Sequence, residues 1–111
     1  MATLILPEQF EAVGDLFSAL ADSSRLAILY LLKEGPAVVS EIVEATGMKQ
    51  SNISKHLSVL YDAGLLARER LGNQIRYSIG DPMVFDLCTL VCRKLHREAE
   101  SRAQVMRKVA R

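Results

Sequence analysis

Residues 40–66 read SEIVEATGMKQSNISKHLSVLYDAGLL, and this stretch decides the fold. Ile42, Val43 and Ala45 give its first part the apolar side of a short helix, and Gly47 supplies the tight turn that follows. The second part has an apolar stripe at helical spacing, formed by Ile53, Leu57, Leu60 and Tyr61. The pattern predicts a helix-turn-helix over residues 38–64.

The other side of the second helix is polar, and its candidate contact residues are Gln50, Ser51, Asn52, Ser54, Lys55 and His56. Gln and Asn form paired hydrogen bonds with adenine, Ser bonds to bases or phosphate, and Lys binds guanine or phosphate. The pattern is typical of a helix that enters the major groove of DNA. The alternative is an ordinary solvated helix face, because two short helices joined by a glycine are common.

A β-hairpin is predicted directly after this helix, over residues 65–79. Ile75, Tyr77 and Ile79 alternate with polar residues, and Gly72-Asn73 is a two-residue turn of the kind that allows positive φ. A hairpin in this place is called a wing, and its basic groups favour phosphate or minor-groove contact over a merely solvated ribbon. The candidate contact residues of the wing are Arg68, Arg70, Asn73, Gln74 and Arg76.

Helices are expected on both sides of this region. Residues 7–35 predict two helices, with Asp22 or Ser23 as the N-cap of the second and Gly35-Pro36 ending it. Asp81-Pro82 predicts the start of a last helix over residues 82–108, which is too long to be explained by packing on so small a domain. Its apolar stripe favours a homodimer interface over cover for its own core, and includes Val84, Leu87, Cys88, Val91, Leu95 and Ala99.

The composition fits a single globular domain spanning residues 1–111, with 50% hydrophobic and 24% charged residues. No run of 18 apolar residues predicts a membrane span, and the start of the sequence lacks the pattern of a secretion signal. Two cysteines without such a signal indicate free thiols in the cytoplasm. The net charge is only +1, but the basic groups of residues 41–80 concentrate at the second helix and the wing.

Several segments together resemble the ArsR (ArsR/SmtB) family of winged helix-turn-helix repressors. The segment LFSALADSSRLAILYLL, residues 16–32, is similar to the opening helices of that family. QSNISKHLSVL at 50–60, AGLL at 63–66 and GNQIRYSI at 72–79 are similar to its recognition helix and wing. The resemblance covers about residues 10–95 and implies a mainly α fold with about five helices plus a two-stranded wing.

The resemblance also implies a function and a way of assembly. It implies a homodimer, formed through the terminal helices, that binds operator DNA, usually represses and is released by an effector. A two-fold dimer presents two recognition helices about one DNA turn apart, so the operator is expected to be an inverted repeat of double-stranded DNA.

Metal sites known in the family are not matched. Ala37-Val38-Val39-Ser40 stands where some members carry a Leu-Cys-Val-Cys segment, and the last helix lacks the histidines of the zinc-type site. What remains is Cys88 and Cys92, one helical turn apart, followed by His96. Three interpretations stay open: packing only, a site for a thiophilic metal or metalloid ion, and redox or persulfide sensing.

Two other classes of function fit the sequence less well. A winged helix used for protein contact would present an acidic or apolar face, whereas this face is polar and basic. A small enzyme is not expected, because no nucleophile elbow, phosphate loop or carboxylate pair stands out. The sequence therefore predicts a non-enzymatic, dimeric, DNA-binding transcriptional regulator, with no certain cofactor and no membrane partner.

Overall fold

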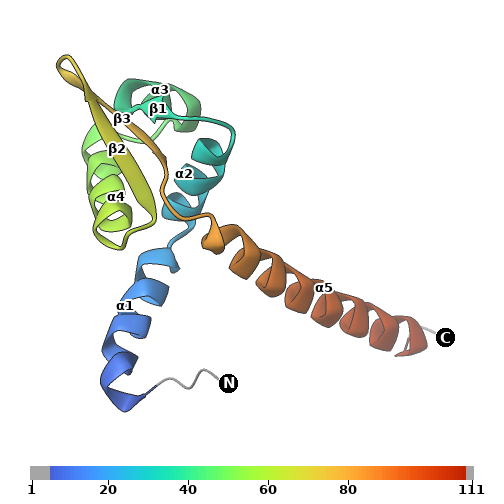
Figure 1. The fold of residues 1–111 in the computed structure, drawn as a ribbon. Helices are drawn as coiled ribbons and strands as arrows, with labels where there is room; N and C mark the ends of the chain where they lie inside the picture. Colours follow the sequence, from blue (N-terminus) through green and yellow to red (C-terminus); the bar gives the residue numbers. More distant parts are fainter. Residues whose placement is uncertain (1–5, 110–111) are drawn as a thin grey trace. The chain divides into compact units, whose positions relative to one another are not determined.

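The computed structural model describes residues 6–109 and is mainly α-helical, with one small sheet (Figure 1). In chain order its elements are the 3-10 turn η1 (Pro7–Gln9), α1 (Phe10–Leu20), α2 (Ser23–Lys33), β1 (Ala37–Val38), α3 (Val39–Thr46), α4 (Gln50–Asp62), β2 (Leu66–Leu71), β3 (Gln74–Ile79) and α5 (Met83–Val109). The predicted order of helices, turn and hairpin is confirmed, with element ends shifted by one to three residues.

The helices begin and end where local chemistry dictates. The Asp22 side chain accepts a hydrogen bond of 3.0 Å from the Arg25 backbone N–H, which makes Asp22 the N-cap of α2. The first α-helix is preceded by η1, whose Gln9 side chain accepts from the Leu6 N–H. Gly47 ends α3 in the left-handed conformation, with φ of 72°, and its N–H donates to the Val43 carbonyl.

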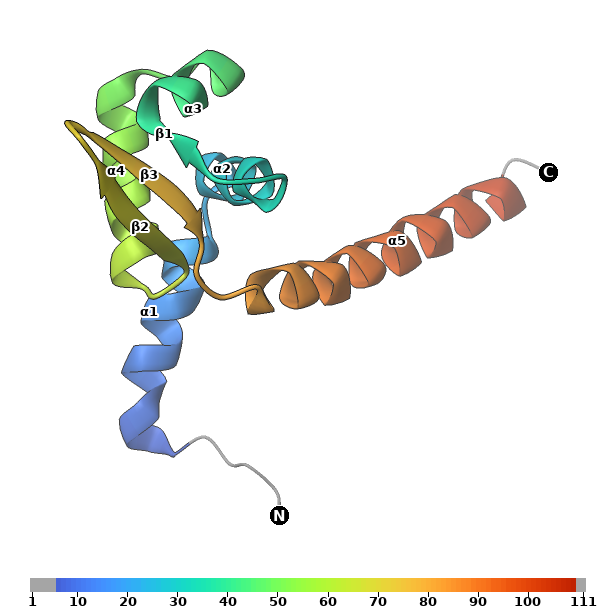
Figure 2. The same ribbon diagram turned by 45° about the horizontal axis from the view of Figure 1, so that its top comes forward.

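The core lies where α2, α3 and α4 pack together beside the sheet (Figures 1 and 2). The apolar faces of the three helices supply most of it, and the hairpin adds the rest, because each element has one side that must leave water. The buried residues of this core include Ile28, Leu29, Leu32, Ile42, Ile53, Leu57, Leu60, Leu65, Leu66 and Tyr77. Burying this stripe of α4 leaves the opposite side of α4 facing solvent.

The sheet has three strands in the order β1-β3-β2, which corrects the expected two-stranded wing. The extra strand, β1, pairs antiparallel with β3, and Ala37 and Val38 lie opposite Tyr77 and Arg76. It follows Gly35-Pro36, which leaves the chain extended after α2. Two residues are too few to show the alternation that predicts a strand, so β1 carries no signal of its own in the sequence.

The structure divides into two compact units, one ending at Asp81 and the other beginning at Pro82. The second unit consists of α5, whose start at Met83 agrees with the expected helix start at Asp81-Pro82. This helix exposes many large apolar side chains: Leu90, Val91, Leu95, Val105, Met106 and Val109. Across residues 6–109, no helix combines the length and the apolar character that spanning a membrane requires.

Candidate nucleic-acid interface

The exposed side of α4 carries most of the predicted contact residues. Gln50, Ser51, Asn52, Ser54 and Lys55 are all exposed at the start of this helix. The Lys49 residue before it is exposed as well, and its basic side chain extends the same polar surface. The hydrophobic stripe of α4 is buried on the opposite side, so these side chains are free to meet a large ligand.

His56 lies elsewhere, which corrects the expectation that it shares the groove-facing side of α4 with Ser54. His56 is half-buried, and its Nδ1 lies 3.3 Å from Nη1 of Arg25 on α2. Two residues on a helix are separated by about 200° around the axis, so Ser54 and His56 point in nearly opposite directions. His56 belongs with the buried stripe, between Ile53 and Leu60.

Arg25 is the centre of a polar cluster behind α4. Its Nε donates to the Ala19 carbonyl at 2.6 Å, and its Nη2 donates to the Ser18 carbonyl at 3.0 Å. The backbone N–H of Arg25 donates to Asp22, which lowers the pKa of that carboxyl below its ordinary value of 3.8. The nearby charges of Arg25 and His56 act in the same direction, while desolvation opposes them.

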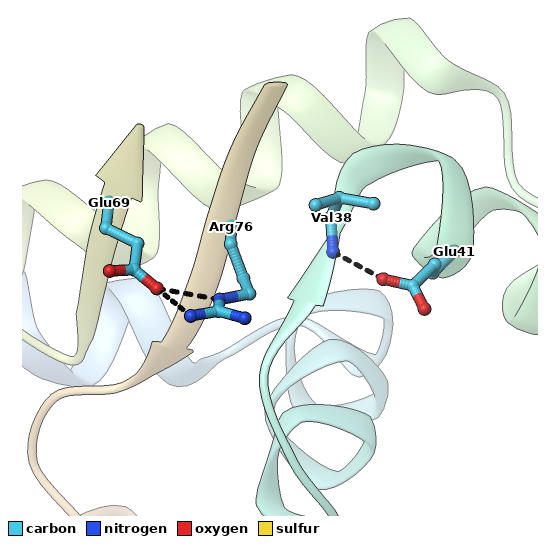
Figure 3. A network of polar contacts seen from close by, with 4 residues as sticks. All are labelled: Val38, Glu41, Glu69 and Arg76. Atoms are coloured by element: carbon cyan, nitrogen blue, oxygen red, sulfur yellow. Dashed lines mark hydrogen bonds and ion pairs between the residues drawn. The ribbon is translucent and has the colours of Figure 1, made fainter. Parts of the chain in front are cut away.

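The wing arginines lie on two different faces of the hairpin. Arg68 pairs with Tyr77 and Arg70 with Ile75, so Arg68 and Arg70 share one face. Arg76 is on the other face, directly opposite Glu69, and the two side chains form an ion pair (Figure 3). The Arg76 Nε lies 2.7 Å from Glu69 Oε1, and both side chains stay about half exposed.

The other two arginines also have contacts within the chain. The Arg68 guanidinium lies over the Tyr61 ring, 3.8 Å from its centroid, and so connects the hairpin to α4. The Arg70 Nε donates to the Gly72 carbonyl at 3.1 Å, next to the turn. Both side chains are exposed, so their charge remains available at the surface of the winged unit.

A cleft of about 330 Å³ joins the recognition helix to the wing. Gln50 and Ser54 of α4 line one part of it, and Asn73 and Gln74 of the turn and β3 line another. The cleft therefore brings together four residues that the sequence placed in two separate motifs. Ser40, at the start of α3, also lines the cleft and was not among the predicted contacts. Its only sequence signal was its position at the beginning of a helix-turn-helix.

The cysteine pair forms a much smaller ligand set. Cys88 is half-buried, and Cys92 and His96 are exposed, all on α5. Within residues 6–109, no three His, Cys, Asp or Glu side chains come together as a metal site. Two thiols one turn apart suit a soft ion of low coordination number, whereas a zinc-like tetrahedral site requires further ligands.

A model of the bacterial regulatory proteins of the arsR family matches residues 22–68, which include α2, α3 and α4. The probable mercury resistance operon repressor of Streptomyces lividans is 45% identical over 74 residues. That alignment covers 67% of this chain and 59% of the repressor. The chain thus spans under two thirds of the length of several curated relatives that it matches.

Other relatives match over nearly their whole length. The HTH-type transcriptional regulator Rv0081 of Mycobacterium tuberculosis is 34% identical over 98 residues, covering 87% of this chain and 86% of Rv0081. The crystal structure of Rv0081 superposes with a TM-score of 0.75, at 33% identity over 89% of this chain and 99% of that chain. The homodimeric winged helix-turn-helix DNA-binding domain Mb0332 of Mycobacterium bovis superposes with a TM-score of 0.70, at 33% identity over 86% and 91% of the two chains. With the winged helix-turn-helix confirmed and these relatives matched, the chain belongs to the ArsR family of bacterial regulatory proteins.

Proposed function

We propose that this protein is a dimeric transcriptional repressor that binds specific double-stranded DNA and acts by binding alone, without catalysis. The observation that carries the proposal is the cleft where Gln50 and Ser54 of α4 meet Asn73 and Gln74 of the wing. A recognition helix and an adjacent wing with exposed hydrogen-bonding groups form a surface that suits a DNA groove and the strand beside it.

The roles of the individual residues follow from their exposure. Gln50, Ser51, Asn52, Ser54 and Lys55 would contact base edges and nearby phosphates, because all five are exposed at the start of α4. The wing residues would hold the phosphate backbone or the adjacent minor groove, and these are Arg68, Arg70, Asn73, Gln74 and Arg76. His56 would support α4 from behind, since it is half-buried against Arg25.

The homodimer is part of the proposal. In α5 the large side chains of Leu90, Val91 and Leu95 are 61%, 49% and 54% exposed, which is unfavourable in water unless another surface covers them. The Mb0332 domain is homodimeric, which favours a second copy of this chain as the partner. A two-fold dimer would bind an inverted-repeat operator in the cytoplasm, where bacterial DNA lies.

For the effector, the sequence of α5 favours a thiophilic metal or metalloid ion held by Cys88 and Cys92, with His96 nearby. Two relatives bear the names of mercury and arsenical resistance operon repressors, which supports this chemistry. Thiolates are the ligands that soft ions prefer, and a two-coordinate ion needs no third group from the same chain. A redox or persulfide signal at the same thiols, and repression without an effector, remain the alternatives.

The proposed function is tested by fluorescence-anisotropy titration of the protein with labelled DNA from upstream of its own gene. We expect tight binding that weakens steeply with salt and exceeds binding to a scrambled duplex. The variant Gln50→Ala/Ser54→Ala removes two groups from the cleft and is expected to lose most of that preference, since a paired base contact contributes about 1–3 kcal/mol.

The matched control is Ser101→Ala, an equally small change at an exposed position of α5. It should bind like the wild type. A folded wild-type protein with no preference for any upstream fragment over scrambled DNA would overturn the proposed function. Equal loss of binding in the cleft variant and the control would overturn the role of the cleft.

The effector is tested on the same complex by adding arsenite, a mercury(II) salt, a persulfide donor and an oxidant in separate titrations. If Cys88 and Cys92 are the sensor, one agent releases the DNA, and Cys88→Ser/Cys92→Ser does not respond to it. Release that persists in this double variant would move the sensor elsewhere, and no release by any agent would favour repression without these effectors.

A further inference from the structure

Arg25 connects three helices of the winged unit through a single side chain. Its guanidinium donates to the Ser18 and Ala19 carbonyls at the end of α1 and lies within hydrogen-bond distance of His56 on α4. Its own backbone is fixed at the start of α2 by the Asp22 cap. Arginine is suited to this place, because its planar group offers five donors in a rigid arrangement.

The contacts with α1 satisfy a defined need. The last carbonyls of an α-helix have no partner within the helix, and the helix dipole makes that end negative. A half-buried guanidinium on two of these carbonyls therefore meets both their hydrogen-bonding requirement and their charge. The bond with His56 forms in the tautomer in which Nδ1 is the acceptor, which leaves the proton of the ring on Nε2.

Apolar packing does not by itself fix the spacing between α1 and α4. A groove of about 660 Å³ opens between these helices, lined by residues that include Leu16 and Val59, and Arg25 also lines this groove. The polar bridge from the end of α1 through Arg25 to His56 therefore crosses a region where the two helices are not fully packed. Loss of the bridge would let α4 shift relative to α1.

We propose that Arg25 is a positioning residue for DNA recognition: it holds α4 through His56 in the orientation that its exposed side needs. The inference rests on the proposed function, and it assigns no DNA contact to Arg25 or His56. Truncating Arg25 should therefore weaken binding without changing which bases are preferred. It should also leave the number of phosphate contacts, and hence the salt slope, unchanged.

The test measures DNA affinity by anisotropy at several salt concentrations for Arg25→Gln, His56→Leu, His56→Gln and the double variant Arg25→Gln/His56→Leu. We expect Arg25→Gln and His56→Leu each to bind about tenfold more weakly, since each removes a bond to a charged group. The double variant should be no weaker than the weaker single variant, because both changes break the same bridge. His56→Gln should bind nearly like the wild type, because its amide oxygen can still accept from Arg25.

The control is Lys33→Gln, which removes one positive charge from the same helix without touching the bridge, and it should change affinity little. Thermal unfolding of each variant shows whether it is folded, and the comparison of His56→Leu with His56→Gln serves if Arg25→Gln fails to fold. Wild-type affinity in Arg25→Gln would overturn the inference. So would additive losses in the double variant, or a smaller salt slope, which would indicate direct phosphate contact.

Nitrogen NMR of the His56 ring tests the bridge without DNA. The wild-type protein should show a single tautomer with the proton on Nε2, and Arg25→Gln should show a mixture. If the wild type binds no DNA, the proposed function fails and the positioning role falls with it, while the tautomer still reports whether the bridge exists. If the wild type binds DNA and the tautomer is unaffected by Arg25→Gln, the inference alone fails.

Discussion

At the scale of single residues, Glu69 limits the charge that the wing offers to DNA. Its carboxylate pairs with Arg76, so part of the positive charge of the hairpin is cancelled inside the protein (Figure 3). Exposed ion pairs contribute little to stability, typically under about 1 kcal/mol. The main effect of Glu69 is therefore expected on DNA binding and not on folding.

We expect Glu69→Gln to bind DNA more tightly, by about threefold to tenfold at low salt, with a steeper salt dependence because Arg76 becomes available to phosphate. Anisotropy titrations across a range of salt concentrations measure both quantities. Glu44→Gln is the matched control, since Glu44 is exposed on α3 and its loss changes the net charge equally. Equal gains in the two variants would mean that net charge, and not the Glu69–Arg76 pair, controls affinity.

Asp22 couples stability to pH. The Arg25 backbone N–H, and then the Arg25 and His56 charges, lower the pKa of Asp22 in the folded protein below its ordinary value of 3.8. A carboxyl with a depressed folded pKa stabilises the fold above its unfolded pKa, and this stabilisation is lost as pH falls through the folded pKa. Asp22→Asn keeps an acceptor for the cap but removes the charge.

Asp22→Asn should therefore melt at a lower temperature than the wild type at neutral pH, and the difference should shrink as the pH falls below 3.8. Thermal unfolding followed by circular dichroism at a series of pH values measures this difference. A difference that stayed constant down to the lowest pH would contradict an electrostatic role for Asp22 and leave only its geometry as a cap.

At the scale of elements, the turn from β3 towards α5 depends on the absence of a side chain at Gly80. A Cβ at this position would lie 2.8 Å from the Leu66 carbonyl carbon and 3.1 Å from the Ala67 nitrogen. Both atoms belong to the backbone of β2, which cannot move aside as a flexible side chain could. The Gly80 N–H also donates to the Leu65 carbonyl at 2.9 Å, which holds the end of β3 against the start of β2.

Gly80→Ala should consequently destabilise the protein by about 1–3 kcal/mol, the usual cost of forcing atoms into a filled space. Urea unfolding gives the change in the free energy of unfolding. Gly14→Ala is the control, because Gly14 lies inside α1 and a methyl group there would meet no atom within 4 Å; it should be neutral or stabilising by up to about 1 kcal/mol. A Gly80→Ala protein as stable as the wild type would show that this close approach relaxes.

The elements that the sequence predicted are those with a clear period. Helix α4 shows its spacing over 13 residues, and the hairpin shows alternation on both sides of Gly72-Asn73. The orientation of His56 could have been predicted from the same period, since His56 lies three residues after buried Ile53. By contrast, β1 is too short to show a period, and its pairing with β3 depends on tertiary packing.

Contacts between distant residues are harder to predict. Once the turn is placed at Gly72-Asn73, the hairpin register puts Glu69 opposite Arg76, so this pair is within reach of the sequence. The bridge from α1 through Arg25 to His56 is not, because it joins residues 31 positions apart through one flexible side chain. The cleft shared by α4 and the wing likewise follows from packing, although the sequence points to four of its residues separately.

At the scale of the whole molecule, the proposed dimer makes a prediction for α5. Leu95 is 54% exposed within one chain, in the middle of the predicted apolar stripe. A second copy would bury it, and the cost of placing a carboxylate there would fall on the dimer and not on the single chain. We expect Leu95→Glu to remain folded but to shift from dimer to monomer, as measured by analytical ultracentrifugation.

The same change should weaken operator binding by about a hundredfold or more, because a monomer loses the high effective concentration of the second recognition helix. The matched control is Arg97→Gln, which lowers the net charge by the same one unit at an exposed position about 200° away around the helix. It should remain dimeric and bind DNA with only a small loss. A dimeric Leu95→Glu protein would exclude this part of α5 from the interface, whereas a monomeric variant with undiminished affinity would show that one copy suffices to bind DNA.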